Sequence, residues 1–329
     1  MHYTFVSTKP QASLLASLLL ASSVSLLTAQ TVSTTPVGYR TDTIPAGNIP
    51  YAPSFVHADT FNGQISSLSE AGGLTTVTFT ESTLTATALD EGTFYPAYYL
   101  EVTETGAYEG YSFDIISNTA STVTVSGLLS SGFGLSSSQT LAGTESVAIR
   151  KHMTVGDIFS DATSALTAYS DTVKFFNDDN TITLLYWDGT MWTPDFSANH
   201  TNKPIYPGEG FLTSFAGSVS LTTNGHVKTT KTKVPVKAGL VNLVGSLAPS
   251  DTTVDGLNAV SALVPYSDSV RVVSQDGNFT TQKTYYTDGS QMTTNFTGND
   301  GSDVIQGHNS ALFSAGSNTY ITLPAAFTP

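Results

Sequence analysis

The sequence predicts an all-β fold that is mainly antiparallel, and three observations support this. Apolar and polar residues alternate with period two in several short segments rich in Thr, Val, Tyr and Phe, side chains that suit a pleated and half-buried surface. Gly, Asn and Ser lie between these segments, as is typical of turns. Strand patterns do not alternate with long helical patterns, which disfavours a parallel α/β sheet.

The strand patterns lie at 75–80, 83–89, 97–103, 111–117 and 121–127. One short helix is expected near 154–166, where Thr154 can cap the first turn. In that segment Val155, Ile158 and Phe159 recur at helical spacing.

Four motifs recur along the chain at offsets of 97 to 100 residues. "YSDTVKFF" at 169–176 returns as "YSDSVRVV" at 266–273, and "YWDG" at 186–189 returns as "YTDG" at 286–289. "TVGDIF" at 154–159 resembles "TVDGL" at 253–257, and 207–222 aligns with 306–322 if one residue is inserted. Two copies are too few for a solenoid or a propeller, so the pattern predicts two homologous β sandwich or barrel-like units.

The predicted domains follow from the leader and the repeat. They are a signal peptide at 1–29, an N-terminal β domain at 30–150, a first β repeat unit at 151–246 and a second at 247–329. Whether the two repeat units share one core is left open by the pattern.

The first 29 residues have the pattern of an export signal. Lys9 precedes an apolar stretch at 13–27, and small residues end at Ala29, as at a cleavage site. The stretch is shorter than the roughly 20 residues of a spanning helix, so no transmembrane anchor is expected after cleavage. The chain is therefore expected outside the cytoplasm of a bacterium: in the periplasm, on the outer surface or secreted.

The composition of the chain limits how it can be stabilised and which classes of partner it can bind. The chain has no cysteine, so its stability must come from buried apolar area and not from disulfides. Its formal net charge of −14 repels phosphate backbones and disfavours nucleic acid as a partner. The partners considered are polysaccharide or other copies of the chain itself.

Several segments carry a family resemblance. They are "TTPVGY" at 34–39, 98–125, "VAIRKHMTVGDIF" at 147–159, "YPGEGF" at 206–211 and "VPVKAGLVNLVGS" at 234–246. On these segments the chain resembles a family of exported bacterial proteins, expanded in verrucomicrobial genomes, to which no activity is assigned. The resemblance implies export and this architecture only.

Both tryptophans lie in "YWDGTMWTP" at 186–194. The Asp-Gly pair predicts a two-residue type I′ hairpin turn, which would place Trp187 and Trp192 as diagonal neighbours on one face. In the second copy Met292 matches Trp192, which favours a core position for Trp192, whereas Thr287 matches Trp187. Trp187 is thus either rim packing or, with Tyr186 and Tyr206, an exposed platform that could stack on a sugar ring.

Calcium is the one cofactor for which the sequence offers ligands. "GNDGSDVIQ" at 298–306 is close to the calcium-binding nonapeptide of β-rolls, with Asp300 and Asp303 as ligands, and Asp178 and Asp179 lie in "NDDN". A single copy of the nonapeptide cannot build the shared site, so polar turns are the competing explanation. No other cofactor is expected.

The sequence shows no nucleophile elbow and no phosphate-binding glycine loop. Glu101, Glu104, Glu109 and Glu209 could supply the carboxylate pair of a glycosidase, but the sequence does not pair them. Asp171 and Asp268, which recur in both copies, are expected to form side-chain turns.

These observations lead to a ranked set of functions. The first is a non-catalytic, secreted or cell-surface β-protein that acts in binding, adhesion or surface assembly. The second is a carbohydrate-binding module that uses aromatic side chains near Trp187. The third is a polysaccharide-active enzyme.

Overall fold

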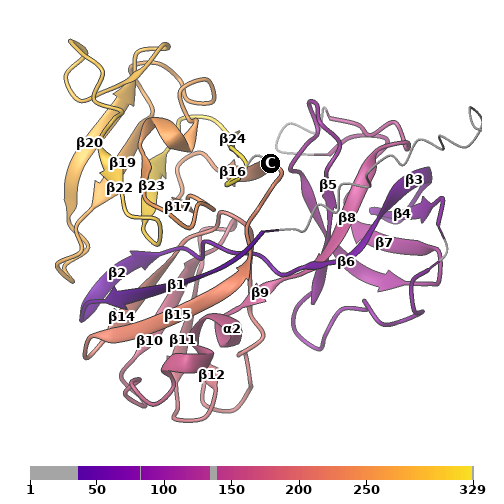
Figure 1. The fold of residues 1–329 in the computed structure, drawn as a ribbon, viewed down its shortest axis with the longest axis horizontal. Coiled ribbons are helices and arrows are strands. Elements are labelled where there is room, and N and C mark those ends of the chain that lie inside the picture. The colour runs from indigo at the N-terminus through magenta and orange to yellow at the C-terminus, as the bar shows by residue number, and fades with distance from the viewer. Residues whose placement is uncertain (1–35, 82, 134–138, 328–329) are drawn as a thin grey trace, which may run out of the picture. The chain divides into compact units, whose positions relative to one another are not determined.

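The computed structural model describes residues 36–81, 83–133 and 139–327, all of which belong to one compact unit. The expected signal peptide at 1–29 lies outside the described residues. The chain is almost entirely antiparallel β, as the alternation predicts (Figure 1).

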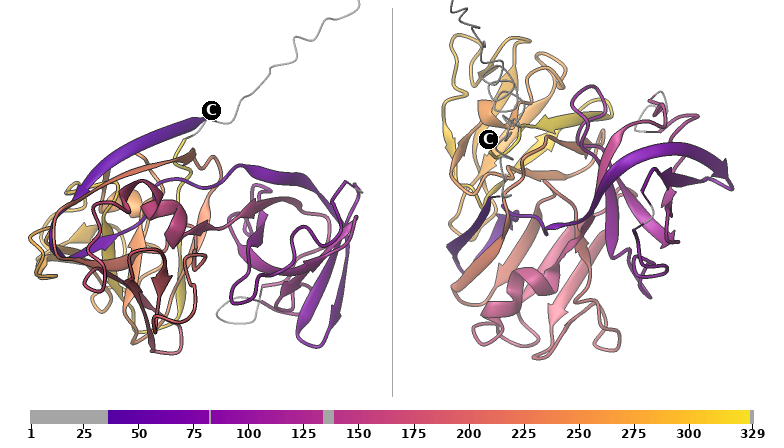
Figure 2. Two further views of the ribbon diagram at one scale, coloured as in Figure 1. Left: turned by 90° about the horizontal axis from the view of Figure 1, so that it is seen from below. Right: turned by 45° about the vertical axis from the view of Figure 1, so that its right-hand side comes forward.

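Six strands in the first half of the chain close into a barrel in the order β3-β4-β7-β6-β5-β8 (Figure 2). Each strand pairs antiparallel with the next, and β8 pairs back with β3. Alternate residues point inward and form one apolar core, which includes Ile65, Leu100 and Val123. The strands are β3 (Asp59–Ala71), β4 (Leu74–Phe79), β5 (Tyr98–Val102), β6 (Ser112–Asn118), β7 (Thr122–Ser126) and β8 (Ser146–Lys151).

The alternating segment 83–89 does not form the strand that the sequence predicts. Its described residues lie in an irregular stretch with turns, and Thr87 has a left-handed φ of +63°. The Asn118 side chain holds this stretch, because its Oδ1 accepts from the Leu89 amide at 2.8 Å and its Nδ2 donates to the Thr85 carbonyl at 2.8 Å. Side-chain hydrogen bonds to the backbone thus replace a ladder here.

The first repeat copy is built on a five-stranded sheet in the order β12-β11-β10-β14-β2. Two further pairs, β1-β15 and β13-β9, complete it. The strands are β1 (Val37–Ile44), β2 (Gly47–Tyr51), β9 (Met153–Thr154), β10 (Thr172–Phe176), β11 (Ile182–Trp187), β12 (Trp192–Thr193), β13 (Pro204–Ile205), β14 (Phe211–Phe215) and β15 (Val219–His226).

The second copy repeats this topology with a sheet in the order β17-β23-β19-β20-β21 and the pairs β16-β24 and β18-β22. Each copy has its own apolar core. The strands are β16 (Thr232–Val236), β17 (Asn242–Gly245), β18 (Thr252–Thr253), β19 (Ser269–Val273), β20 (Thr281–Thr287), β21 (Met292–Thr293), β22 (Val304–Ile305), β23 (Ser310–Ser314) and β24 (Thr319–Leu323).

The helix expected near 154–166 is present as α2 (Val155–Phe159), followed by a 3₁₀ turn, η1 (Ser160–Ala162). Thr154 caps it as predicted, and the Asp157 side chain accepts from the Thr154 amide in return. This reciprocal capping box fixes where the helix begins. A single 3₁₀ turn, η2 (Asp255–Leu257), takes the place of α2 in the second copy.

The strand pairing changes the domain boundaries. β1 and β2 pair with β15 and β14 of the first copy, so the range 30–150 is not one N-terminal β domain. β16 and β17 pair with β24 and β23 in the same way, so the second copy begins near residue 232 and not at 247. The barrel is therefore an insertion into the first copy, between β2 and β9.

Reciprocal backbone bonds join the two copies. The Ala52 amide, just after β2, donates to the His308 carbonyl at 2.9 Å, and the Gly245 amide, at the end of β17, donates to the Gly208 carbonyl at 3.0 Å. These two bonds occupy equivalent places in the two copies, which is the pattern of a self-complementary two-fold interface within one chain. A Cβ at Gly245 would lie 2.1 Å from the Ala52 Cβ, so this contact requires glycine.

Candidate functional site

The tryptophan hairpin differs in register from the sequence prediction. Trp187 pairs directly with Trp192, so the loop has four residues and not two. The Asp188 carboxylate closes it by accepting from the Thr190 and Met191 amides, each at 2.7 Å. This side-chain turn lengthens the loop, yet the two indoles still share a face, with ring centroids 5.7 Å apart.

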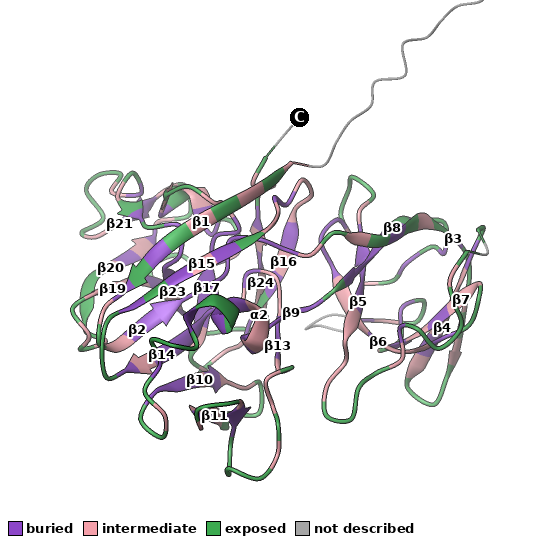
Figure 3. Cartoon of the chain, turned by 60° about the horizontal axis from the view of Figure 1, so that its bottom comes forward, coloured by how far each residue is buried: buried purple, intermediate pink, exposed green. Residues whose placement is uncertain are grey.

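Both tryptophans belong to the core of the first copy. Trp192 is 1% exposed, as its match with Met292 predicts. Trp187 is only 5% exposed, and its counterpart Thr287 is fully buried. Trp187 therefore presents no free ring, because its side chain belongs to the core of the first copy. Figure 3 shows how buried and exposed residues are distributed along the chain.

The other two residues of the expected platform lie elsewhere. Tyr186 faces the opposite side of its strand from Trp187 and packs on Phe196. The Tyr206 hydroxyl donates to Asp114 of the barrel at 2.7 Å, and its ring lies edge-on to His152. Burial and the neighbouring Asp114 raise the pKa of Tyr206 far above its usual range. Trp187, Tyr186 and Tyr206 do not form one surface.

An exposed aromatic cluster does lie on this hairpin, and we name Tyr169, Tyr186 and Phe196 aromatic cluster 1. The Phe196 ring centroid lies 5.5 Å from that of Tyr169 and 5.3 Å from that of Tyr186. Tyr169 is 68% and Phe196 48% exposed.

The second copy carries the same arrangement, aromatic cluster 2, formed by Tyr266, Tyr286 and Phe296. The Phe296 ring centroid lies 5.3 Å from that of Tyr266 and 5.5 Å from that of Tyr286. Tyr266 is 66% and Phe296 46% exposed. The two clusters are equivalent in residue type, geometry and exposure, although the core beneath them has changed from Trp192 to Met292.

Two residues of each cluster have a left-handed backbone conformation. The φ angles are +62° at Tyr169 and +61° at Phe196, and +63° at Tyr266 and +61° at Phe296. This conformation costs roughly 1–2 kcal/mol for a residue with a Cβ and normally favours Gly or Asn. Large aromatic side chains at four such positions indicate a role beyond the turn itself.

The loops that carry the phenylalanines share the pattern T-x-[DN]-F-[ST]. The Thr193 hydroxyl accepts from the Asp195 amide at 3.4 Å, and the Thr293 hydroxyl accepts from the Asn295 amide at 3.3 Å. This pattern recurs at an offset of 100 residues, so the sequence contains the signal for the clusters. The hydrogen bonds explain the turn, whereas the ring at the fourth position is not needed for it.

Asp171 and Asp268 form side-chain turns, as the sequence predicts. The Asp171 carboxylate accepts from the Thr167 amide at 2.8 Å and from the Ala216 amide at 2.7 Å. Asp268 accepts from the equivalent Val264 and Gly316 amides, both at 2.8 Å. Both carboxylates are buried, and their oxygens serve the fold.

The calcium candidates of the nonapeptide are occupied by other bonds. Asp300 accepts from the amide and the hydroxyl of Thr294, at 2.7 and 2.6 Å. Asp303 forms an ion pair with Lys283 and accepts from the Tyr285 hydroxyl.

The first copy builds the same turn without these carboxylates. The Asp300 amide donates to the Met292 carbonyl. In the first copy the His200 amide donates to the carbonyl of Trp192, which is the residue equivalent to Met292. Lys203 likewise takes the place of Asp303. The first copy therefore forms the same turn without the two carboxylates that were candidate calcium ligands in the second copy.

Asp178 and Asp179 also have local partners. Asp178 forms an ion pair with Lys237 at 2.7 Å, and Asp179 accepts from the amide of Thr181 at 3.0 Å. Within residues 36–81, 83–133 and 139–327, no three His, Asp or Glu side chains gather as a metal site would require.

All four candidate glutamates have structural partners. Glu101 is 2% exposed and forms ion pairs with Arg150 and Lys228. Glu109 forms an ion pair with Lys231 at 2.9 Å, and Glu104 accepts from a backbone amide of β8.

Glu209 in addition lines a cavity of about 670 Å³ together with Asp114, Tyr206 and Lys203. Its carboxylate accepts from the Tyr206 amide at 2.9 Å. Burial raises the pKa of Glu209, and the charges of Asp114 and Asp178 add to the shift while Lys203 opposes it.

No helix in the part of the chain that the structure describes is long and apolar enough to cross a membrane. The chain matches no protein-family model, no curated protein and no solved structure.

Proposed function

We propose that the chain is an exported, non-catalytic binding protein that attaches to polysaccharide through aromatic clusters 1 and 2. The observation that carries the proposal is the duplicated set of exposed rings held at left-handed backbone positions. Export rests on the leader at 1–29 and on the family resemblance.

Aromatic rings suit sugars because the C–H face of a pyranose packs on a π surface while its hydroxyls keep their bonds to water. A scattered exposed ring is normal on any protein surface. Six rings arranged in two equivalent groups, with each phenylalanine roughly half exposed, are better explained by a ligand that contacts both groups.

Two sites on one chain favour a polymeric ligand. When one cluster is bound, the second meets its site at a high effective concentration, so avidity can exceed either single affinity by roughly 10²–10⁴-fold. The net charge of −14 disfavours polyanions, so a neutral polysaccharide is the expected ligand.

The test is a pull-down of the full chain with insoluble cellulose, chitin, xylan and mannan. Phe196→Ala and Phe296→Ala should each weaken binding at least tenfold, and the double variant should abolish it. Ile182→Ala is the matched control, because Ile182 is a large apolar residue on β11, 56% exposed and outside the cluster. Full binding by the double variant, or no binding of the native chain to any of the four, would refute the proposal.

Attachment to other copies of the chain is the competing use of the same rings. It predicts concentration-dependent association in sedimentation that the double variant loses, with no retention on polysaccharide.

Glu209 favours a second candidate function, cleavage of polysaccharide. A carboxyl group with a raised pKa in a cavity can act as a general acid, and Asp114 is a second carboxylate in the same cavity. This function predicts release of reducing ends from a polysaccharide, which Glu209→Gln should abolish without loss of attachment. Attachment without any release of reducing ends excludes it.

A further inference from the structure

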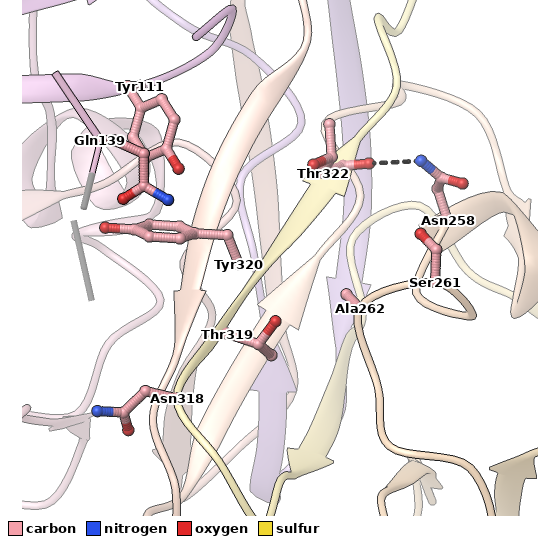
Figure 4. A pocket seen from close by; sticks show the side chains of 9 residues that line it. All are labelled: Tyr111, Gln139, Asn258, Ser261, Ala262, Asn318, Thr319, Tyr320 and Thr322. Atoms are coloured by element: carbon pink, nitrogen blue, oxygen red, sulfur yellow. Dashed lines mark hydrogen bonds between the residues drawn. The ribbon is translucent and has the colours of Figure 1, made fainter. Parts of the chain in front are cut away.

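A second hollow is lined only by uncharged side chains (Figure 4). Its volume is about 350 Å³, within the range of roughly 300–1,000 Å³ found for small-molecule sites. Tyr111 and Gln139 come from the barrel side, and Asn258, Asn318 and Tyr320 come from the second copy.

Two tyrosines form one wall of this pocket. The Tyr111 and Tyr320 ring centroids lie 4.9 Å apart with the planes at 75°, and Figure 4 shows both rings beside Gln139. Tyr111 is only 6% exposed, and burial with the neighbouring tyrosines raises its pKa to about 12, so Tyr320 has the more open of the two rings.

Amides and a hydroxyl provide the polar part of the pocket. Asn258 donates through Nδ2 to the Thr322 carbonyl at 3.0 Å, which leaves its Oδ1 for another partner. Asn318 accepts through Oδ1 from the Ala238 amide at 2.9 Å, which leaves its Nδ2. The Gln139 Oε1 is buried without a hydrogen-bond partner within the described ranges. A buried acceptor without a partner is costly unless a ligand or a water satisfies it.

The duplication does not require this pocket. Val219 pairs with Ile44 in the first copy, and Thr319 pairs with Val236 in the second, so Tyr320 is equivalent to Ser220. Ser220 is an exposed strand residue. The tyrosine at this position is thus specific to the second copy, and the core repeats without it.

We propose that the pocket binds a neutral saccharide unit, with the Tyr320 ring against the apolar face of the sugar and Asn258, Asn318 and Gln139 bonded to its hydroxyls. No charged side chain of the described residues lines the pocket itself, and Lys233 beside it already donates to the Thr322 hydroxyl at 2.8 Å, so a neutral sugar is the proposed ligand and trigalacturonate tests an acidic one. This inference rests on the proposed function. The ligand would be a short oligosaccharide or the end of a polysaccharide chain, and the site is separate from the aromatic clusters.

The experiment is a calorimetric titration of the full chain with cellotetraose, xylotetraose, mannotetraose, chitotetraose and trigalacturonate. Tyr320→Ser introduces the residue of the first copy, and Asn258→Gly suits the left-handed φ of +52° at this position, so both should fold. Each should weaken binding of the neutral oligosaccharide at least tenfold and leave retention on insoluble polysaccharide unchanged. The Phe196→Ala/Phe296→Ala double variant should do the reverse.

The outcomes separate the two proposals. No heat with any neutral tetrasaccharide, tighter binding of trigalacturonate, or native affinity in both pocket variants would overturn the pocket inference. Loss of retention in the double variant with no pocket binding would leave the proposed function standing alone. Thermal melting of each variant by circular dichroism confirms that it is folded.

Discussion

Removing the Lys228 charge should destabilise the barrel strongly. Lys228 follows β15, and its side chain is 1% exposed. Its ammonium forms an ion pair with Glu101 of the barrel and donates to the Lys231 carbonyl at 3.1 Å. Glu101 also accepts from Arg150 at 3.0 Å, and Arg150 forms an ion pair with Asp59, so two cations and two carboxylates share one cluster.

The magnitude follows from burial. Lys228→Met leaves Glu101, whose side chain is 2% exposed, to share Arg150 with Asp59, so one negative charge of the cluster is no longer compensated. Breaking a buried pair in this way typically costs about 3–5 kcal/mol, since the remaining charge stays desolvated. Lys228→Met combined with Glu101→Gln removes that uncompensated charge and should recover about 2 kcal/mol of this loss.

Lys231 provides the matched control. It also pairs with a barrel glutamate, Glu109, at 2.9 Å, but its side chain is 45% exposed. Lys231→Met deletes the same charge three residues away, and an exposed pair contributes only about 0–1 kcal/mol.

The assay is urea unfolding followed by circular dichroism for the whole chain and by tryptophan fluorescence for the first copy, which holds both Trp187 and Trp192. The loss from Lys228→Met should appear in circular dichroism at lower urea than the fluorescence change. Equal losses for Lys228→Met and Lys231→Met would refute the reasoning, because burial would then not decide the cost.

Three further predictions can be checked by the same unfolding measurements. Trp192→Met, which copies Met292 into the first core, should cost about 2–4 kcal/mol because the surrounding core is packed for an indole; a loss below 1 kcal/mol would show that this core adapts. Asp171→Asn and Asp268→Asn should cost equal amounts, about 1–2 kcal/mol each, since each removes the charge from an acceptor of two amides; clearly unequal losses would contradict the equivalence of the copies. Burial alone would raise the pKa of Glu101, but the charges of Lys228 and Arg150 outweigh it and hold the pKa below the usual 4.5. The contribution of Glu101 to the free energy of unfolding is therefore complete above pH 4.5 and falls as the pH drops below that value. A free energy of unfolding that does not change from pH 5 to pH 3, relative to Glu101→Gln, would contradict this prediction.

The sequence was sufficient to predict the fold class, the short helix and the duplication, because all three depend on local patterns. The turns of Asp171 and Asp268 were predictable for the same reason. The barrel insertion was not predicted, since strand pairing between residues such as Ile44 and Val219 leaves no periodic signal. A weak signal does exist, because Ala46-Gly47 of the first copy recurs as Ala238-Gly239 and both glycines have positive φ.

The site was less predictable than the fold. Asp188-Gly189 favours a two-residue turn, but the hydrogen bonds of the Asp188 carboxylate stabilise a four-residue loop instead. The two turns differ little in free energy, so the sequence alone does not decide between them. The exposure of Phe196 and Phe296 depends on a left-handed backbone that sequence rules disfavour for aromatic residues. The sequence leaves Trp187 open between rim packing and an exposed ring, because rim and core residues alternate along one strand with the same spacing, and the structure buries it.

The insertion point of the barrel has a consequence for how the chain can be rearranged. Asp59 and Arg150 pair across neighbouring strands, so the barrel starts and finishes at almost the same place. In the second copy six residues, 246–251, connect β17 directly to β18. A linker of that length between β2 and β9, in place of the barrel, would yield a protein of two copies with the same topology. The barrel could also be replaced by another domain whose N- and C-termini lie close together.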